Sequence, residues 1–143
     1  MNNFEQNISN IMKGTPIANS VYNNIKKQVE KTNITPGLAI VLIGNKKESR
    51  TYVNIKRNRC KKYGLKSVIV ELDENVMEKD VLKEVNELNN DNTIHGIIIQ
   101  LPLPKHLNER TILDSISHEK DVDGLGTRNV GSLLIGEGDR KST

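Results

Sequence analysis

Three segments carry polar side chains that a plain packing role does not require. In the first, Tyr52 and Lys56 are four residues apart, a spacing that puts both on one helix face, where the tyrosine hydroxyl can reach the ammonium group. Lys56 also shares an apolar stripe with Val53 and Cys60. Burying an ammonium group is costly unless it is paired. The pattern therefore indicates either a functional lysine or one whose stem packs while its head stays in water.

The second segment is Ile-Gln-Leu-Pro-Leu-Pro at residues 99–104. Because Pro102 cannot continue a central strand, the strand must end here. Gln100 is therefore predicted at the carboxyl edge of a buried strand, where its amide can donate to a ligand oxygen. The alternative is that Gln100 only solvates the strand end and the prolines only shape a turn.

The third segment is Asp121-Val122-Asp123-Gly124. Two carboxylates two residues apart, followed by a glycine, predict a tight loop with one acid pointing inward. An EF-hand is excluded because Ser132 stands where its final glutamate is required. An acidic turn in water is the alternative. The three histidines are scattered without ligand spacing, so no metal site is predicted.

Helix and strand patterns alternate along the chain and can position these segments. Strands are predicted at 38–43, 66–72 and 94–101, and helices at 16–31, 49–63, 78–89 and 108–116. Thr15, Ser49 and Asn108 are the expected helix caps. The alternation predicts an α/β fold, a three-layer αβα sandwich with a mostly parallel sheet. In such sheets ligands bind beyond the carboxyl ends of the strands.

Composition limits the class of protein. The chain has 143 residues, 35% hydrophobic residues and a net charge of +3, as expected for one folded domain. A single cysteine excludes a disulfide framework and fits a reducing compartment, so a cytoplasmic location is expected. No apolar run is long enough for a membrane span. A basic segment at 56–62 suggests nucleic-acid binding, but aromatic residues make up only 3%. Neither a nucleic-acid nor a membrane partner is expected.

Taken together, SRTYVNIK, GIIIQLPLPKH and HEKDVDG, in this order and spacing, form a specific set. The chain resembles the bifunctional methylenetetrahydrofolate dehydrogenase/methenyltetrahydrofolate cyclohydrolase family over about residues 13–136. The resemblance implies one-carbon metabolism with tetrahydrofolate derivatives as substrates. It implies that Lys56 is the central catalytic residue, assisted by Tyr52 and Gln100, and that Asp123 binds the pterin ring. The implied substrate-binding set is Ser49, Tyr52, Lys56, Ile99, Gln100, Leu101 and Asp123.

The resemblance also implies the chemistry. Water attacks an amidinium-like methenyl bridge, and a proton must then move between nitrogen, oxygen and the enzyme. A positioned lysine can carry that proton when its surroundings favour the neutral amine. An apolar stripe around Lys56 has this effect, because burial disfavours the charged form. Tyr52 can stack on the folate rings.

The sequence departs from the family that it resembles, above all in length. The family chain is about twice as long and has a Rossmann-type NADP-binding domain, whereas Gly124-Leu125-Gly126 is not a dinucleotide loop because Asn129 replaces its third glycine. We expect a folate-binding catalytic domain at 1–135, a disordered tail at 136–143 and no cofactor-binding residues. Cyclohydrolase chemistry is then expected and hydride transfer is not. The alternative is a non-catalytic folate-binding or inert remnant that pairs with another subunit, as a homodimer or with a separate NADP-binding half.

Overall fold

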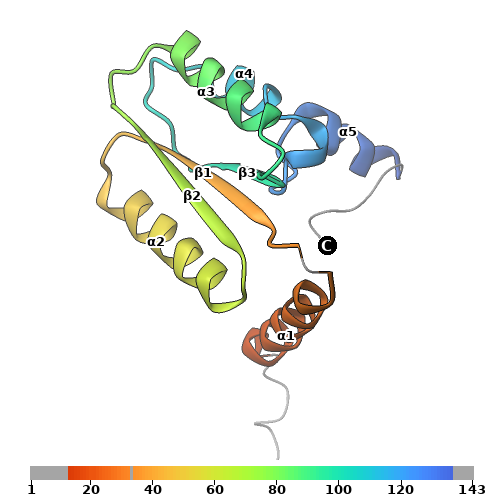
Figure 1. Ribbon diagram of the computed structural model, residues 1–143. Helices are drawn as coiled ribbons and strands as arrows, with labels where there is room; N and C mark the ends of the chain where they lie inside the picture. Colours follow the sequence, from red (N-terminus) through yellow and green to blue (C-terminus); the bar gives the residue numbers. More distant parts are fainter. Residues whose placement is uncertain (1–12, 33, 137–143) are drawn as a thin grey trace, which may run out of the picture. The chain divides into compact units, whose positions relative to one another are not determined.

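A computed structural model describes residues 13–32 and 34–136 (Figure 1). Its contacts divide the chain into two units, residues 1–34 and 35–143. In the first unit the predicted helix is confirmed as α1 (Gly14–Thr32). It begins earlier than predicted, so the Thr15 cap is wrong. A proline is tolerated in a first helical turn, where its missing N–H would have no partner, and Pro16 therefore does not mark the start. Residues 1–12 of the expected folate-binding domain lie outside the described residues.

The second unit is built on a parallel sheet whose strands have the order β2-β1-β3. The strands are β1 (Gly37–Ile43), β2 (Lys66–Leu72) and β3 (Gly96–Ile99). Val41 of the central strand pairs with Val70 on one side and Ile99 on the other. This position explains the uninterrupted apolar sequence of β1, since a parallel strand with helices on both faces has no solvent side.

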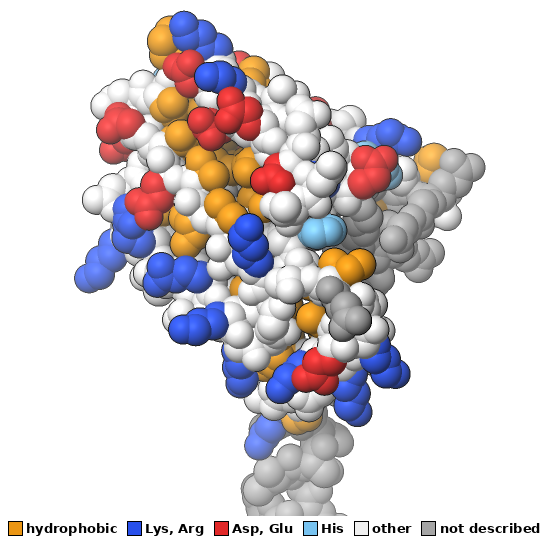
Figure 2. Space-filling model, in the orientation of Figure 1, with side chains coloured by type: hydrophobic (Ala, Val, Ile, Leu, Met, Phe, Trp, Pro, Cys, Tyr) orange, Lys and Arg blue, Asp and Glu red, His pale blue; other side chains and the backbone are white. Residues whose placement is uncertain are grey.

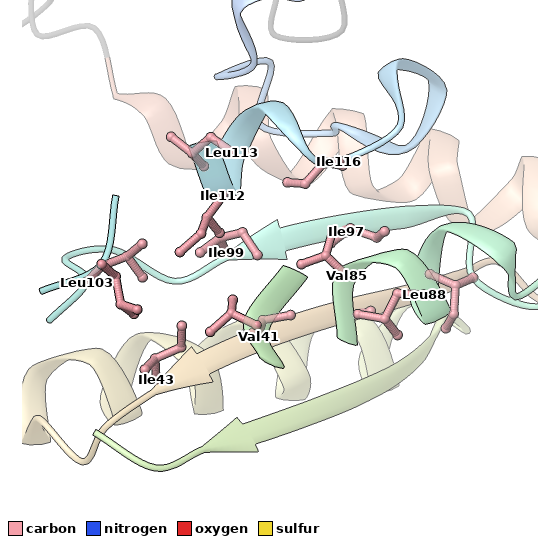
Figure 3. Close-up of a cluster of buried hydrophobic side chains, with 14 residues drawn as sticks. Val41, Ile43, Val85, Leu88, Ile97, Ile99, Leu103, Ile112, Leu113 and Ile116 are labelled. Atoms are coloured by element: carbon pink, nitrogen blue, oxygen red, sulfur yellow. The ribbon is translucent and has the colours of Figure 1, made fainter. Parts of the chain in front are cut away.

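Helices cover both faces of this sheet, which confirms the three-layer αβα prediction (Figure 1). The helix α2 (Lys47–Lys62) packs its Val53 against Ile40 and Leu42 of β1. The opposite face carries Val41 and Ile43, which join the larger core shown in Figure 3. That core is completed by α3 (Glu78–Asn90) and α4 (Glu109–Asp114). Alternate residues of β1 thus face opposite helical layers.

One strand boundary differs from the prediction, and one helix cap agrees with it. The third strand is shorter than the predicted 94–101, because the chain leaves the sheet after Ile99 and turns through a cis peptide bond between Leu101 and Pro102. The Asn108 cap is confirmed, since its side chain accepts a hydrogen bond from the Thr111 backbone N–H at 3.1 Å.

The end of the second unit contains two helices that the sequence did not predict. A short 3-10 helix, η1, spans His118–Lys120, and α5 spans Thr127–Ile135. The signal for α5 is the apolar spacing of Val130, Leu133 and Leu134, closed by Gly136 at φ 71°. Residues 137–143 of the predicted tail lie outside the described residues. None of the helices in the described ranges is long and apolar enough to cross a membrane.

Candidate active site

Lys56 and Gln100 meet at the carboxyl edge of the sheet. Lys56 lies on α2, and Gln100 is the first residue after β3. The Lys56 Nζ donates a hydrogen bond to the Gln100 Oε1 at 3.1 Å. The two predicted site residues are therefore brought into contact by the fold, on the edge where ligands of parallel α/β sheets bind.

The Gln100 side chain is held from several directions. Its backbone N–H donates to the Val41 carbonyl at 2.8 Å, which extends the sheet by one bond beyond β3. Its Nε2 donates to the Leu101 carbonyl at 2.9 Å, and the residue is only 9% exposed. Because Nε2 is engaged in this way, Oε1 is the atom turned to Lys56. Gln100 is thus a buried, oriented acceptor rather than a residue that merely solvates a strand end.

Lys56 belongs to the face of α2 that packs on the sheet. Ser49, Val53 and Cys60 of this face are buried, at 5%, 2% and 6% exposed, while Lys56 is half-buried. The apolar stripe around the lysine is therefore confirmed. The prediction that Ser49 caps the helix is wrong, because α2 begins at Lys47 and turns Ser49 inward in its first turn.

Tyr52 lies one position from Val53 and remains 59% exposed. Within the described ranges, Lys56 Nζ is hydrogen-bonded to Gln100 rather than to the Tyr52 hydroxyl as predicted. The reason is that Gln100 presents a buried, oriented acceptor at the sheet edge. The exposed ring of Tyr52 stays accessible to a planar ligand.

The acidic loop has one buried and one exposed carboxylate, as predicted. The buried acid is Asp121, which is 2% exposed and forms a parallel bridge to Ile97 of β3. Its carboxylate accepts hydrogen bonds from the backbone N–H groups of Gly124 and Gly126 at 3.1 and 2.9 Å. Asp123, the residue with the implied pterin role, is exposed. Asp121 therefore builds the loop, and Asp123 is left available to a ligand.

An open hollow of about 470 Å³ lies beyond the carboxyl ends of β1 and β2. Arg50 in its lining was not singled out from the sequence. Its guanidinium donates two hydrogen bonds to the Glu71 carboxylate, at 3.0 and 2.9 Å, and a third to Asn45 at 2.8 Å. The Arg50 hydrogen bonds hold the pKa of the Glu71 carboxyl below its usual value. Arg50 is committed to these partners, so its charge is already balanced within the hollow.

The part of the chain that the structure describes has no group of three or more His, Cys, Asp or Glu side chains arranged to hold a metal ion. Gly124 and Gly126 precede α5 but do not form a dinucleotide loop. They follow the 3-10 helix η1 rather than a strand of a βαβ unit, and Asn129 occupies the position of the third glycine. The described residues therefore do not fit the nicotinamide cofactor.

Comparisons with known proteins show the family to which the chain is similar. Residues 12–123 match the family model described as tetrahydrofolate dehydrogenase/cyclohydrolase, catalytic domain. The chain is 48% identical over 130 residues to the bifunctional protein FolD of Listeria innocua, covering 89% of this chain and 46% of that protein. It is 46% identical over 129 residues to the bifunctional protein FolD 2 of Arabidopsis thaliana, covering 87% and 43%. The chain spans about half the length of the curated relatives it matches.

Solved structures show the same likeness. The bifunctional FolD methylenetetrahydrofolate dehydrogenase/cyclohydrolase of Campylobacter jejuni superposes with a TM-score of 0.83 at 37% identity, covering 87% of this chain and 45% of that one. The Trypanosoma brucei FolD, solved with NADP cofactor and an inhibitor, superposes with a TM-score of 0.82 at 33% identity, covering 90% and 45%.

Proposed function

The chain belongs to the tetrahydrofolate dehydrogenase/cyclohydrolase family, and we propose that it binds a tetrahydrofolate derivative and hydrolyses its methenyl bridge. The observation that carries the proposal is the 3.1 Å hydrogen bond between Lys56 Nζ and Gln100 Oε1 at the sheet edge. An amine held beside an oriented amide oxygen is placed to accept a proton and return it. The proposal assigns the chain to one-carbon folate metabolism.

The reaction divides between the residues of the site. As the oxygen of a water molecule adds to the methenyl carbon, the Lys56 amine takes a proton from that water. Lys56 then returns this proton to one ring-side nitrogen as its bond to the carbon breaks. The remaining hydroxyl loses its proton to solvent, leaving a formyl group on the other nitrogen. Gln100 keeps the amine aimed at this carbon, because its own orientation is fixed by Leu101.

The remaining predicted residues bind the substrate in this proposal. The exposed ring of Tyr52 stacks on the pterin. Asp123 accepts hydrogen bonds from pterin N–H groups, and the main chain at Ile99 and Leu101 lies beside the ring. Ser49 also contacts the substrate in this proposal, from its buried position in the first turn of α2. No hydride-transfer step is part of the proposal, because the described residues do not fit the nicotinamide cofactor.

The test is direct. The whole chain, a Lys56→Ala variant and a Lys83→Ala control are compared for the loss of 5,10-methenyltetrahydrofolate absorbance over an enzyme-free blank. Lys83 is a matched lysine on α3, 73% exposed, in an ion pair with Glu87. After circular dichroism shows all three to be folded, the wild type and the control should exceed the blank and Lys56→Ala should not. A wild type that equals the blank, or a Lys56→Ala variant that equals the wild type, overturns the proposal.

A second candidate is a non-catalytic folate-binding or inert remnant that pairs with another subunit. Apolar side chains reach the surface of the molecule (Figure 2), and Leu133, Leu134 and Ile135 at the end of α5 are 51%, 81% and 69% exposed. Such a face favours association, with a second copy or with a separate NADP-binding half. Sedimentation of the chain alone distinguishes a homodimer from a monomer that awaits a partner.

For either candidate we propose a cytoplasmic location, which suits the free, buried thiol of Cys60.

A further inference from the structure

The buried carboxyl group of Asp121 accepts hydrogen bonds from four neutral donors. Its Oδ1 accepts hydrogen bonds from the backbone N–H groups of Gly124 at 3.1 Å and Leu125 at 3.4 Å. Its Oδ2 accepts from the Gly126 backbone N–H at 2.9 Å and from the Asn129 Nδ2 at 2.8 Å. Both oxygens of this side chain are therefore engaged as acceptors.

These bonds tie together three parts of the second unit. Asp121 itself is bridged to Ile97 of β3. The Gly124 and Gly126 amides belong to the loop, and Asn129 lies in the first turn of α5. Asp123 is the exposed residue held within this closed loop. Its direction is therefore set by the same hydrogen bonds that the Asp121 carboxylate accepts.

A carboxylate is required for this arrangement. In an Asp121→Asn variant one oxygen becomes an NH₂ group, which can donate but not accept. Because N–H donors face both oxygens of Asp121, the new NH₂ group would face N–H donors in either orientation of the amide. The substitution keeps the shape of the side chain and removes at least one pair of loop bonds. The arrangement is also close-packed at Gly126, because a Cβ added there would lie 3.0 Å from Asp121 Oδ2.

We propose that Asp121 is a positioning residue that acts through Asp123, fixing the loop so that the Asp123 carboxylate meets the pterin. The inference rests on the proposed folate binding. The two acids then have different roles: Asp123 contacts the substrate, whereas Asp121 contributes to affinity without touching it. Lys56 and Gln100 are held by separate contacts, so their hydrogen bond does not depend on Asp121.

A double-mutant cycle tests the proposal. The affinity of the whole chain for 5-formyltetrahydrofolate is measured by calorimetry for the wild type, Asp121→Asn, Asp123→Asn and the double variant. Each single variant should bind about tenfold more weakly, as expected for losing buried hydrogen bonds to a charged group. The double variant should bind no more weakly than Asp123→Asn. A purely structural role for Asp121 would instead weaken binding equally in both backgrounds.

Two further variants keep the test interpretable. Asn129→Ala removes a single bond to Asp121 and should give a smaller loss that also disappears in the Asp123→Asn background, even if Asp121→Asn does not fold. Asp91→Asn is the matched control, since the Asp91 side chain accepts from the Thr93 backbone N–H at 2.7 Å in the turn that precedes β3. It should bind as the wild type does. If the wild type binds the folate and neither Asp121→Asn nor Asn129→Ala weakens that binding, this inference is overturned but the proposed function is not. A wild type that does not bind the folate overturns the proposed function and, with it, the inference.

Discussion

The Lys56 Nζ donates to the Gln100 side-chain oxygen at 3.1 Å, although the two residues are 44 positions apart in the sequence. One residue comes from a helix and the other from the end of a strand. The contact exists because β1 and β3 are parallel neighbours and α2 follows β1 directly. A parallel sheet collects the residues after its strands at one edge, and here it collects an amine and an amide oxygen.

The charge of residue 100 should control the pH dependence of the proposed activity. Gln100→Glu places a carboxylate beside Lys56, which favours the charged ammonium over the amine that accepts a proton. We expect the rate near neutral pH to fall at least about tenfold, and the rising limb of the pH–rate profile to move to higher pH. The measurement is methenyl hydrolysis between pH 6 and pH 10.

Gln100→Met is the companion variant for that experiment, because it removes the hydrogen bond without adding a charge. Its rate should also fall, but its rising limb should not move to higher pH. Equal pH profiles for the two variants would contradict the role assigned to Gln100.

The aromatic ring of Tyr52 should matter more than its hydroxyl. Since Lys56 bonds to Gln100 and Tyr52 is 59% exposed, Tyr52→Phe should bind 5-formyltetrahydrofolate nearly as the wild type does. Tyr52→Ala should bind roughly three- to tenfold more weakly, as expected for the loss of one aromatic stacking contact. Calorimetric titration measures both, and a larger loss in Tyr52→Phe would show that the hydroxyl carries the interaction.

Lys120 should stabilise the second unit from a position just before the acidic loop. Its Nζ donates to the backbone carbonyls of Leu88, Asn89 and Asp91 at 3.1, 2.7 and 2.8 Å, which satisfies the carboxyl end of α3. Lys120→Met should lower the free energy of unfolding by about 2 kcal/mol in urea denaturation. Lys83→Met, which breaks an exposed ion pair, should change it by no more than about 0.5 kcal/mol. Equal losses would refute this role.

The contribution of Asp114 to the free energy of unfolding should depend on pH. Its carboxylate accepts from the Thr127 backbone N–H at 2.6 Å and from the Thr127 hydroxyl at 2.8 Å. These hydrogen bonds lower the pKa of Asp114 from its ordinary value of 3.8. A carboxyl with a lowered pKa stabilises the fold above its ordinary pKa and loses that contribution as the pH falls through the folded value.

The difference in unfolding free energy between the wild type and Asp114→Asn should therefore be constant from pH 7 to about pH 5 and shrink below 3.8. Comparing the two proteins removes the contributions of other carboxylates. A difference that stays constant to pH 2.5 would contradict the assignment, as would a direct titration of Asp114 by carbon NMR that shows no lowering.

Local sequence patterns were sufficient to predict most of the helices and strands. The bounds of β2 agree with the prediction, and the apolar run of β1 was recognised because a strand buried on both faces has no polar side. Asn108 was recognised as a cap because a side-chain oxygen there satisfies a free backbone N–H. The helix α5 was missed because its apolar residues Val130, Leu133 and Leu134 are few and adjoin the polar residues predicted as a tail.

The sequence by itself determined the αβ alternation, the family and the residue types of the site, because periodicity and motif spacing are local properties of the chain. Only the tertiary structure decided that Lys56 pairs with Gln100 instead of Tyr52, and that Asp121 is buried while Asp123 is exposed. Those outcomes depend on which strand lies beside which and on where four amide donors converge. The Lys56–Gln100 contact joins residues 44 positions apart, and the burial of Asp121 also depends on its bridge to Ile97 of β3, so no local pattern encodes either outcome.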